Sequence, residues 1–225
     1  MCSFRLMIRP FSSVTPRQFH FFPPFPALKM STLVDPTQNN SLTNSKPIIR
    51  VGATATVIRE SPSSSSPDYE FLLIQRGKFP MKNFYALPGG SIKFSETIQQ
   101  AARRELFEEC NIQNIQIIET IQVTEILPAV TNSANHFILV HTLCQRLSRE
   151  QQSSIKAGDD AINVRWLTRD QIVSMNKNVK SLSLEGQRGD ISSDLELIVP
   201  NVLEVVDSAL SRFKKYYENE ANKYS

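Results

Sequence analysis

Residues 90–112 read GSIKFSETIQQAARRELFEECNI, and this stretch determines the fold and function that we expect. It contains Glu105, Glu108 and Glu109. Residues three or four apart are neighbours on a helix, so the three carboxylates are expected on one side of a single helix. A divalent cation that prefers oxygen ligands, Mg²⁺ or Mn²⁺, would remove their mutual repulsion. The pattern predicts a metal-binding helix; the alternative is a solvated helix with ordinary Glu–Arg pairs.

The residues before this helix indicate a tight turn. Gly89 and Gly90 allow a ligand to approach the backbone closely. We expect Ser95 to be the N-cap and Glu96 to lie in the first turn, where negative charge suits the helix dipole. Arg104 can hold Glu96, or the glutamate that follows it, by a charge-assisted hydrogen bond.

The stretch resembles the Nudix box, G-x5-E-x7-R-E-U-x-E-E-x-G-U, where U is a bulky aliphatic residue. The matching positions are Gly90, Glu96, Arg104, Glu105, Leu106, Glu108, Glu109 and Ile112. One position departs from the box, because Asn111 stands where the box has glycine. Asparagine is the next best residue for the left-handed conformation that often follows a helix, so we expect the metal site to be intact.

The resemblance implies an α+β fold, the Nudix-type αβα sandwich with a mixed sheet between helices. It also implies metal-dependent hydrolysis of a nucleoside diphosphate linked to another moiety. The implied metal ligands are Glu105, Glu108, Glu109 and the backbone at Gly89. Of these, Glu105 could also help to deprotonate the attacking water.

Further residues are implied around this centre. Arg104 and Glu96 would orient the carboxylates and complete the catalytic set. Candidates for substrate contacts are Gly90, Arg76, Asp159 and Asp160. The two aspartates are also candidates for the general base, although turn formation explains them equally well. An exposed surface ion pair is the simpler interpretation of Arg76.

The segment Ala157–Ala161 and the later Arg165-Trp166 resemble a subgroup of small Nudix proteins described as ADP-ribose pyrophosphatases. We therefore expect ADP-ribose to be cleaved to AMP and ribose 5-phosphate. Within the enzymes, the alternatives are oxidised or non-standard nucleoside triphosphates, NADH, diadenosine polyphosphates and the mRNA cap. A Nudix-fold binding module without catalysis is an alternative of another class, but such modules commonly lose box carboxylates, and all are present here.

Several other side chains could touch a substrate. Phe84, Phe137 and Trp166 could stack on a base, although aromatic residues in strands usually belong to the core. His136 and His141 could contact the ligand, although a single histidine on a strand is more often structural.

The order of patterns predicts strands, one inserted helix, more strands and then helices, which is typical of an α+β sandwich. Strands are expected near 49–57, 71–74, 84–87, 116–126, 137–143 and 163–167. A short helix is expected to begin at Asp170–Met175. A last helix is expected from Pro200, with apolar residues at helical spacing as far as Phe213. We expect the Nudix domain to span residues 47–217, followed by a tail over 218–225.

The composition indicates which kinds of partner and which cellular compartment to expect. The net charge of +3 in 225 residues gives no case for nucleic-acid binding, and no run of about 18 apolar residues predicts a membrane helix. Three cysteines without a CxxC pair fit a reducing compartment. We expect a small nucleotide as ligand, and the family resemblance implies a possible homodimer.

Residues 1–46 differ from the rest of the chain. Residues 1–34 contain Arg5, Arg9, Arg17 and Lys29 but no acidic residue. This composition is typical of a mitochondrial or plastid transit peptide, here followed by a polar linker. The alternative is a disordered extension of a cytoplasmic protein.

Overall fold

A computed structural model of the chain describes residues 48–62, 68–79, 81–127, 135–146, 155–184 and 195–223. The expected transit peptide and linker lie outside the described residues. The elements, in chain order, are β1 (Ile49–Glu60), β2 (Tyr69–Arg76), β3 (Tyr85–Ala86), β4 (Gly89–Ser91), α1 (Ile98–Cys110), β5 (Ile115–Ile126), β6 (His136–Arg146), β7 (Ala161–Thr168), α3 (Arg169–Leu184) and α4 (Val202–Asn222).

The strands form one seven-stranded mixed sheet with β1 at its centre. Along one edge, β1 pairs in parallel with β6, from Ile49 to Ile58. Along the other edge it pairs antiparallel with β4 at Gly52–Thr54 and with β2 at Ile58–Glu60. The strands β3 and β7 pair with β2, and β5 pairs with β6.

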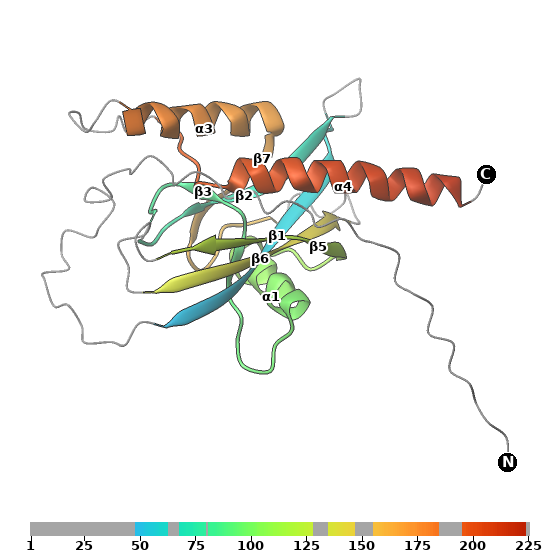
Figure 1. Cartoon of the computed structure of the whole chain (residues 1–225), viewed down its shortest axis with the longest axis horizontal. Helices are drawn as coiled ribbons and strands as arrows, with labels where there is room; N and C mark the ends of the chain where they lie inside the picture. Colours follow the sequence, from blue (N-terminus) through green and yellow to red (C-terminus); the bar gives the residue numbers. More distant parts are fainter. Residues whose placement is uncertain are drawn as a thin grey trace, which may run out of the picture.

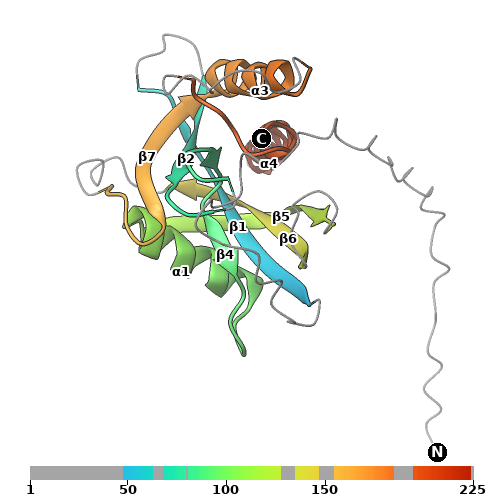
Figure 2. The same cartoon turned by 90° about the vertical axis from the view of Figure 1, so that its left-hand side faces the viewer.

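Helices cover both faces of the sheet. Figures 1 and 2 show α1 on one face and α3 and α4 on the other. The predicted α+β sandwich, with a mixed sheet between helices, is therefore confirmed. Among the described residues, no helix is both long and apolar enough to span a membrane.

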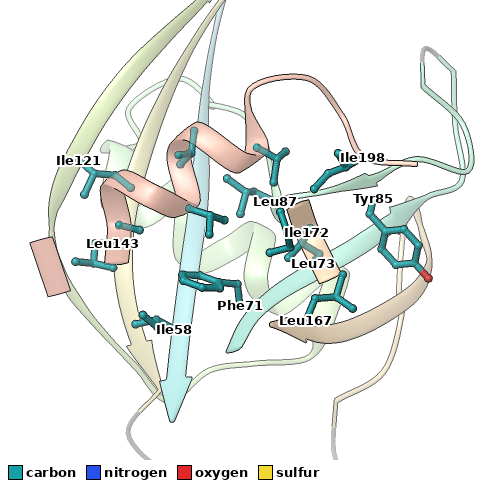
Figure 3. Close-up of a cluster of buried hydrophobic side chains, with 14 of the residues drawn as sticks. Ile58, Phe71, Leu73, Tyr85, Leu87, Ile121, Leu143, Leu167, Ile172 and Ile198 are labelled. Carbon is teal, nitrogen blue, oxygen red and sulfur yellow. The ribbon is translucent and has the colours of Figure 1, made fainter. Parts of the chain in front are cut away.

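Each face of the sheet has its own hydrophobic core. Side chains of β2 alternate between the two cores, as expected for a strand covered on both sides. Phe71 and Leu73 pack toward α3 and α4, in the cluster drawn in Figure 3. Leu72 and Ile74 pack toward α1, together with Ala102 and other buried residues.

The strand expected near 49–57 is confirmed as β1, and it is buried at every position from Gly52 to Ile58, because it lies between helices on both sides. One expectation about an element needs correction. The last helix begins at Val202, after Pro200, and runs to Asn222, so it passes through most of the expected tail. The domain boundary at 217 remains a prediction.

Candidate active site

The glycine turn is fixed by its pairing with β1. An ideal Cβ on Gly89 would lie 2.5 Å from the carbonyl oxygen of Ala53 and 2.7 Å from the Cα of Thr54. No larger residue fits between these backbone atoms. The Gly89 N–H donates a 2.9 Å hydrogen bond to Oε2 of Glu109, so the turn also holds a side chain of α1.

Gly90 lies against another carboxylate of the same helix, that of Glu105. An ideal Cβ at this position would lie 2.4 Å from Oε1 of Glu105. The missing side chain therefore provides the space that the Glu105 carboxylate occupies. Both glycines of the turn are thus required by close contacts rather than by the turn alone.

The helix α1 begins later than expected, and its cap is Thr97. The Thr97 side chain accepts a hydrogen bond from the Gln100 N–H, and the Gln100 side chain accepts one from the Thr97 N–H, which forms a capping box. The prediction of Ser95 as the N-cap was wrong, because the helix begins at Ile98 and Thr97, directly before it, makes the capping hydrogen bonds; Ser95 lies two residues earlier, with a left-handed φ of 64°. Glu96 consequently precedes the helix.

The helix ends as predicted. Asn111 adopts a left-handed conformation, with φ 55° and ψ 36°, and its N–H donates to the carbonyls of Leu106 and Phe107. Asparagine therefore replaces glycine at a position whose main requirement is this conformation.

Arg104 organises the carboxylates. Its Nε and Nη2 donate to the two oxygens of Glu96 at 2.8 and 2.9 Å, and Nη2 also donates to the Ser91 carbonyl at 3.0 Å. Its Nη1 donates to Glu105 at 2.5 Å and to Glu108 at 2.9 Å. The predicted pairing with Glu96 or Glu105 is confirmed, and Glu108 joins the same network.

Charge and burial shift the carboxyl pKa values in opposite directions. The hydrogen bonds from Arg104 lower the pKa of Glu96 to about 2. Burial raises the pKa of Glu105, and it raises that of Glu109 to about 8. Such buried carboxyls gain most from a neighbouring positive charge, since their ionised form lacks solvation.

The sequence-predicted residues line one cleft of about 410 Å³. Its charged and glycine lining consists of Arg76, Lys78, Gly89, Gly90, Lys93, Arg104, Glu105, Glu108, Glu109, Asp159 and Asp160. Glu96 lies behind this wall and contacts it through Arg104. Sequence reasoning missed Lys78 and Lys93; the only available signal was their position beside Arg76 and within the box.

A short turn connects the two sides of the cleft. The Gly158 N–H donates to the Glu109 carbonyl at 3.1 Å, and the Gly77 N–H donates to the Asp160 carbonyl at 2.7 Å. The side chain of Asp160 pairs with Lys78. The expected turn at 158–160 therefore exists, and it also places both of its aspartates in the cleft.

Arg76 is not the exposed surface arginine that we considered simpler. It is half-buried and lines the cleft. Burial lowers its pKa, while the carboxylates of Glu109 and Asp160 act in the opposite direction.

The aromatic and histidine candidates lie elsewhere. Phe84 is buried beside Leu197, and the Arg59 guanidinium covers the Trp166 ring at 4.1 Å. His141 is buried between threonine hydroxyls, and His136 lies 2.8 Å from Glu125. None of these residues, nor Phe137, belongs to the cleft lining.

Comparison with known proteins identifies the family. A model of the NUDIX domain matches residues 52–184, which is more than half of the chain. The chain belongs to the Nudix family.

Individual relatives agree with this assignment. The ADP-ribose pyrophosphatase of Methanocaldococcus jannaschii is 32% identical over 94 residues, a match that covers 42% of this chain. The chain spans about half (52%) of the length of that curated relative.

Solved structures support the Nudix fold. The Nudix domain of NrtR from Shewanella oneidensis, determined with ADP ribose, is 14% identical with a TM-score of 0.51, covering 82% of this chain and 97% of that one. NrtR of the same organism is 16% identical with the same TM-score, covering 74% and 64%. At these identities the likeness concerns the fold alone.

The Nudix box residues have the chemistry of a divalent cation site. The lining carries five acidic and four basic side chains, so it has a small negative excess and needs added positive charge to hold a diphosphate. In the described part of the chain, no three carboxylate, histidine or cysteine side chains are gathered around one point. Arg104 holds Glu105 and Glu108, and the Gly89 N–H holds Glu109, so these carboxylates would have to exchange these hydrogen bonds for a cation in order to bind one.

Proposed function

We propose that this Nudix protein hydrolyses the diphosphate bridge between a nucleoside and another moiety, with ADP-ribose as the preferred substrate. Water adds to one phosphorus atom, the bridging P–O bond breaks, and ADP-ribose yields AMP and ribose 5-phosphate. The observation that supports this proposal is the single cleft that combines the box carboxylates with Arg76, Lys78 and Lys93.

The basic side chains bind and orient the diphosphate. Arg76 is the last residue of β2, Lys78 follows two residues later, and Lys93 lies in the segment before α1, so different parts of the chain supply the basic side chains of the cleft. Such positioning supplies much of the catalysis of phosphoryl transfer.

The carboxylates hold the cation and handle the proton. Glu105, Glu108 and Glu109, with the backbone at Gly89, would bind Mg²⁺ or Mn²⁺, which neutralises phosphate charge and acidifies a bound water. Glu105, whose pKa burial raises, is suited to accept the proton of the attacking water. Asp159 and Asp160, on the opposite wall, are the alternative bases.

ADP-ribose leads the substrate proposal for two reasons. The curated relative from Methanocaldococcus jannaschii is described as an ADP-ribose pyrophosphatase. The turn that resembles those of such enzymes, at Gly158–Asp160, forms one wall of the cleft here. Nucleoside triphosphates, NADH and diadenosine polyphosphates are the competing substrates.

A substrate panel with Mg²⁺ tests the proposal. The panel contains ADP-ribose, NADH, diadenosine tetraphosphate and an oxidised nucleoside triphosphate, and released AMP or pyrophosphate is measured. ADP-ribose should give the highest kcat/KM, a chelator should abolish turnover, and added Mg²⁺ should restore it.

A matched pair of variants separates catalysis from binding. Glu108→Gln should lower kcat at least 100-fold without loss of the fold, because it removes one proposed cation ligand. Glu218→Gln, at an exposed site on α4, should leave turnover unchanged. If the wild-type protein hydrolyses none of the panel but binds ADP-ribose without metal, it is a binding module and not a hydrolase.

A further inference from the structure

Glu108, one of the proposed cation ligands, is already paired with two positive side chains of the protein itself. Lys93 Nζ lies 3.5 Å from its Oε1, and Arg104 Nη1 donates to its Oε2 at 2.9 Å. All three side chains line the cleft. A divalent cation can therefore bind Glu108 only in competition with these two groups.

Lys93 and Arg104 are held to very different degrees. The Arg104 side chain is 18% exposed, and it also donates to both oxygens of Glu96 and to Glu105. The Lys93 side chain is 63% exposed, and within the described ranges Glu108 is the one ion-pair partner of its ammonium. An exposed lysine pair at this distance is weak and easily exchanged. Lys93 is therefore the group that a cation would displace.

The backbone of Lys93, in contrast to its side chain, is fixed. Its N–H donates a 2.9 Å hydrogen bond to Oε2 of Glu96, the same oxygen that Arg104 holds, and its carbonyl accepts a 3.1 Å hydrogen bond from the Glu96 N–H. The flexible four-carbon stem of a lysine can turn about such an anchor. An ammonium that leaves Glu108 would consequently remain at the cleft and be available to a phosphate.

Lys78 provides a comparison within the same cleft. It is also exposed and also pairs with an acidic residue, but that residue is Asp160, which is not among the proposed cation ligands. Binding of a cation to the box carboxylates does not require this pair to open. The two lysines should therefore respond differently to the cation.

We propose that Lys93 is an exchangeable counter-ion: it pairs with Glu108 in the free protein, is displaced when the divalent cation binds, and then binds the diphosphate. This inference rests on the proposed function and adds regulation to it, because cation binding and substrate binding become coupled through one side chain. By linkage the coupling is reciprocal, so each ligand should raise the affinity for the other.

Titration of the protein with Mn²⁺ alone, with free Mn²⁺ measured by electron paramagnetic resonance, tests the first step. Lys93→Met keeps the length of the side chain and should tighten Mn²⁺ binding about threefold, the size expected when one exposed ion pair no longer competes. Lys93→Arg keeps the charge and should not tighten Mn²⁺ binding. Lys78→Met removes the same charge from the cleft but should leave the Mn²⁺ affinity nearly unchanged.

The second step is tested with an ADP-ribose analogue whose phosphorus atoms are joined by a methylene group, which cannot be hydrolysed at that bridge. Calorimetry with and without Mn²⁺ gives the factor by which the cation raises the affinity for the analogue. That factor should be about threefold smaller in Lys93→Met than in wild type, because the variant has no counter-ion to release.

Three results would overturn the inference alone. In the first, Lys93→Met binds Mn²⁺ no more tightly than wild type. In the second, Lys78→Met tightens Mn²⁺ binding as much as Lys93→Met does, which makes the net charge of the cleft the cause. In the third, Mn²⁺ raises the affinity for the analogue by the same factor in Lys93→Met and wild type.

Failure of the proposed function gives a different pattern. A wild-type protein that binds no Mn²⁺ would contradict the proposed cation site and this inference together. A protein that hydrolyses nothing in the substrate panel, but shows the expected Mn²⁺ affinities, would contradict the hydrolase and support the exchange at Lys93.

Discussion

Gly89 and Gly90 are adjacent, yet the contacts that exclude a side chain differ between them. At Gly89 the excluded Cβ would meet backbone atoms of Ala53 and Thr54, which cannot move without separating β4 from β1. At Gly90 its three nearest neighbours would be the carboxylate atoms of Glu105, the end of a side chain that can rotate away. The same substitution at the two positions should therefore have different consequences.

We predict that Gly89→Ala destabilises the fold and that Gly90→Ala impairs turnover. Gly89→Ala should lower the free energy of unfolding by about 2–3 kcal/mol, as overpacking against backbone does. Gly90→Ala should change stability by less than about 1 kcal/mol but lower kcat at least tenfold, because Glu105 is displaced. Urea denaturation and steady-state kinetics measure both; equal stability losses in the two variants would contradict this explanation.

A second prediction for a single residue concerns His141 and the dependence of stability on pH. It is 4% exposed, with its ring nitrogens 2.7 and 2.8 Å from the hydroxyls of Thr54 and Thr124. Burial lowers its pKa from 6.5 to about 4. The unfolded chain therefore takes up a proton near pH 6.5 that the folded protein does not take up until about pH 4.

The His141 contribution to stability is thus fully present above pH 6.5 and is lost as the pH falls toward 4. The loss should reach about 3 kcal/mol. Comparing the free energy of unfolding of wild type and His141→Gln between pH 7.5 and 4.5 isolates this contribution from that of the carboxyls. The wild type should lose more stability on acidification, and parallel curves would show that His141 is not responsible.

At the scale of the element, α1 depends on a defined residue at each end. Thr97 closes a capping box at the start, and Asn111 adopts the left-handed conformation at the end. The ends matter because α1 carries three cleft carboxylates and Arg104, so fraying of either end would alter their positions.

The effect of a substitution at Asn111 on stability should depend on whether the new residue tolerates positive φ, and not on the chemistry of its side chain. Asn111→Ala should destabilise the protein by about 1 kcal/mol, because alanine is strained at positive φ. Asn111→Gly should be neutral or slightly stabilising, since glycine restores the residue expected by the box. Thermal unfolding of the two variants gives the comparison, and an Asn111→Gly loss as large as that of Asn111→Ala would refute it.

The element scale also shows what local sequence could and could not predict. The glycine turn, the glutamate helix and the left-handed Asn111 follow from residue types at short spacing. The choice between Ser95 and Thr97 as the cap does not, since both are good caps locally. It is settled by the turn at Lys93–Glu96, which depends on Arg104 eight residues further along.

At the scale of the whole molecule, the order of the elements along the chain and the mixed sheet between helices agree with the predicted sandwich. What the sequence could not predict is which distant residues meet: Arg76, Lys78 and Asp160 reach the cleft only because β7 pairs with β2.

The first 46 residues give a prediction that concerns the whole chain. We propose that they direct the protein to mitochondria or plastids, on the basis of the basic, acid-free composition of residues 1–34. A fusion of residues 1–46 to a fluorescent protein should be imported into an organelle. Replacement of Arg5, Arg9 and Arg17 by glutamine should leave the fusion in the cytosol, and import that survives these changes would argue against the proposal.

The central position of β1 has a consequence for how the protein unfolds. Its backbone is hydrogen-bonded to β6 on one edge and to β4 and β2 on the other, and its middle is covered on both faces. Its amides should therefore exchange with deuterium only when the entire molecule unfolds. Because Gly89 and Gly90 pair with that same strand, the glycine turn should share its slow exchange. Protection of these amides should be lost in one global unfolding step rather than by local opening.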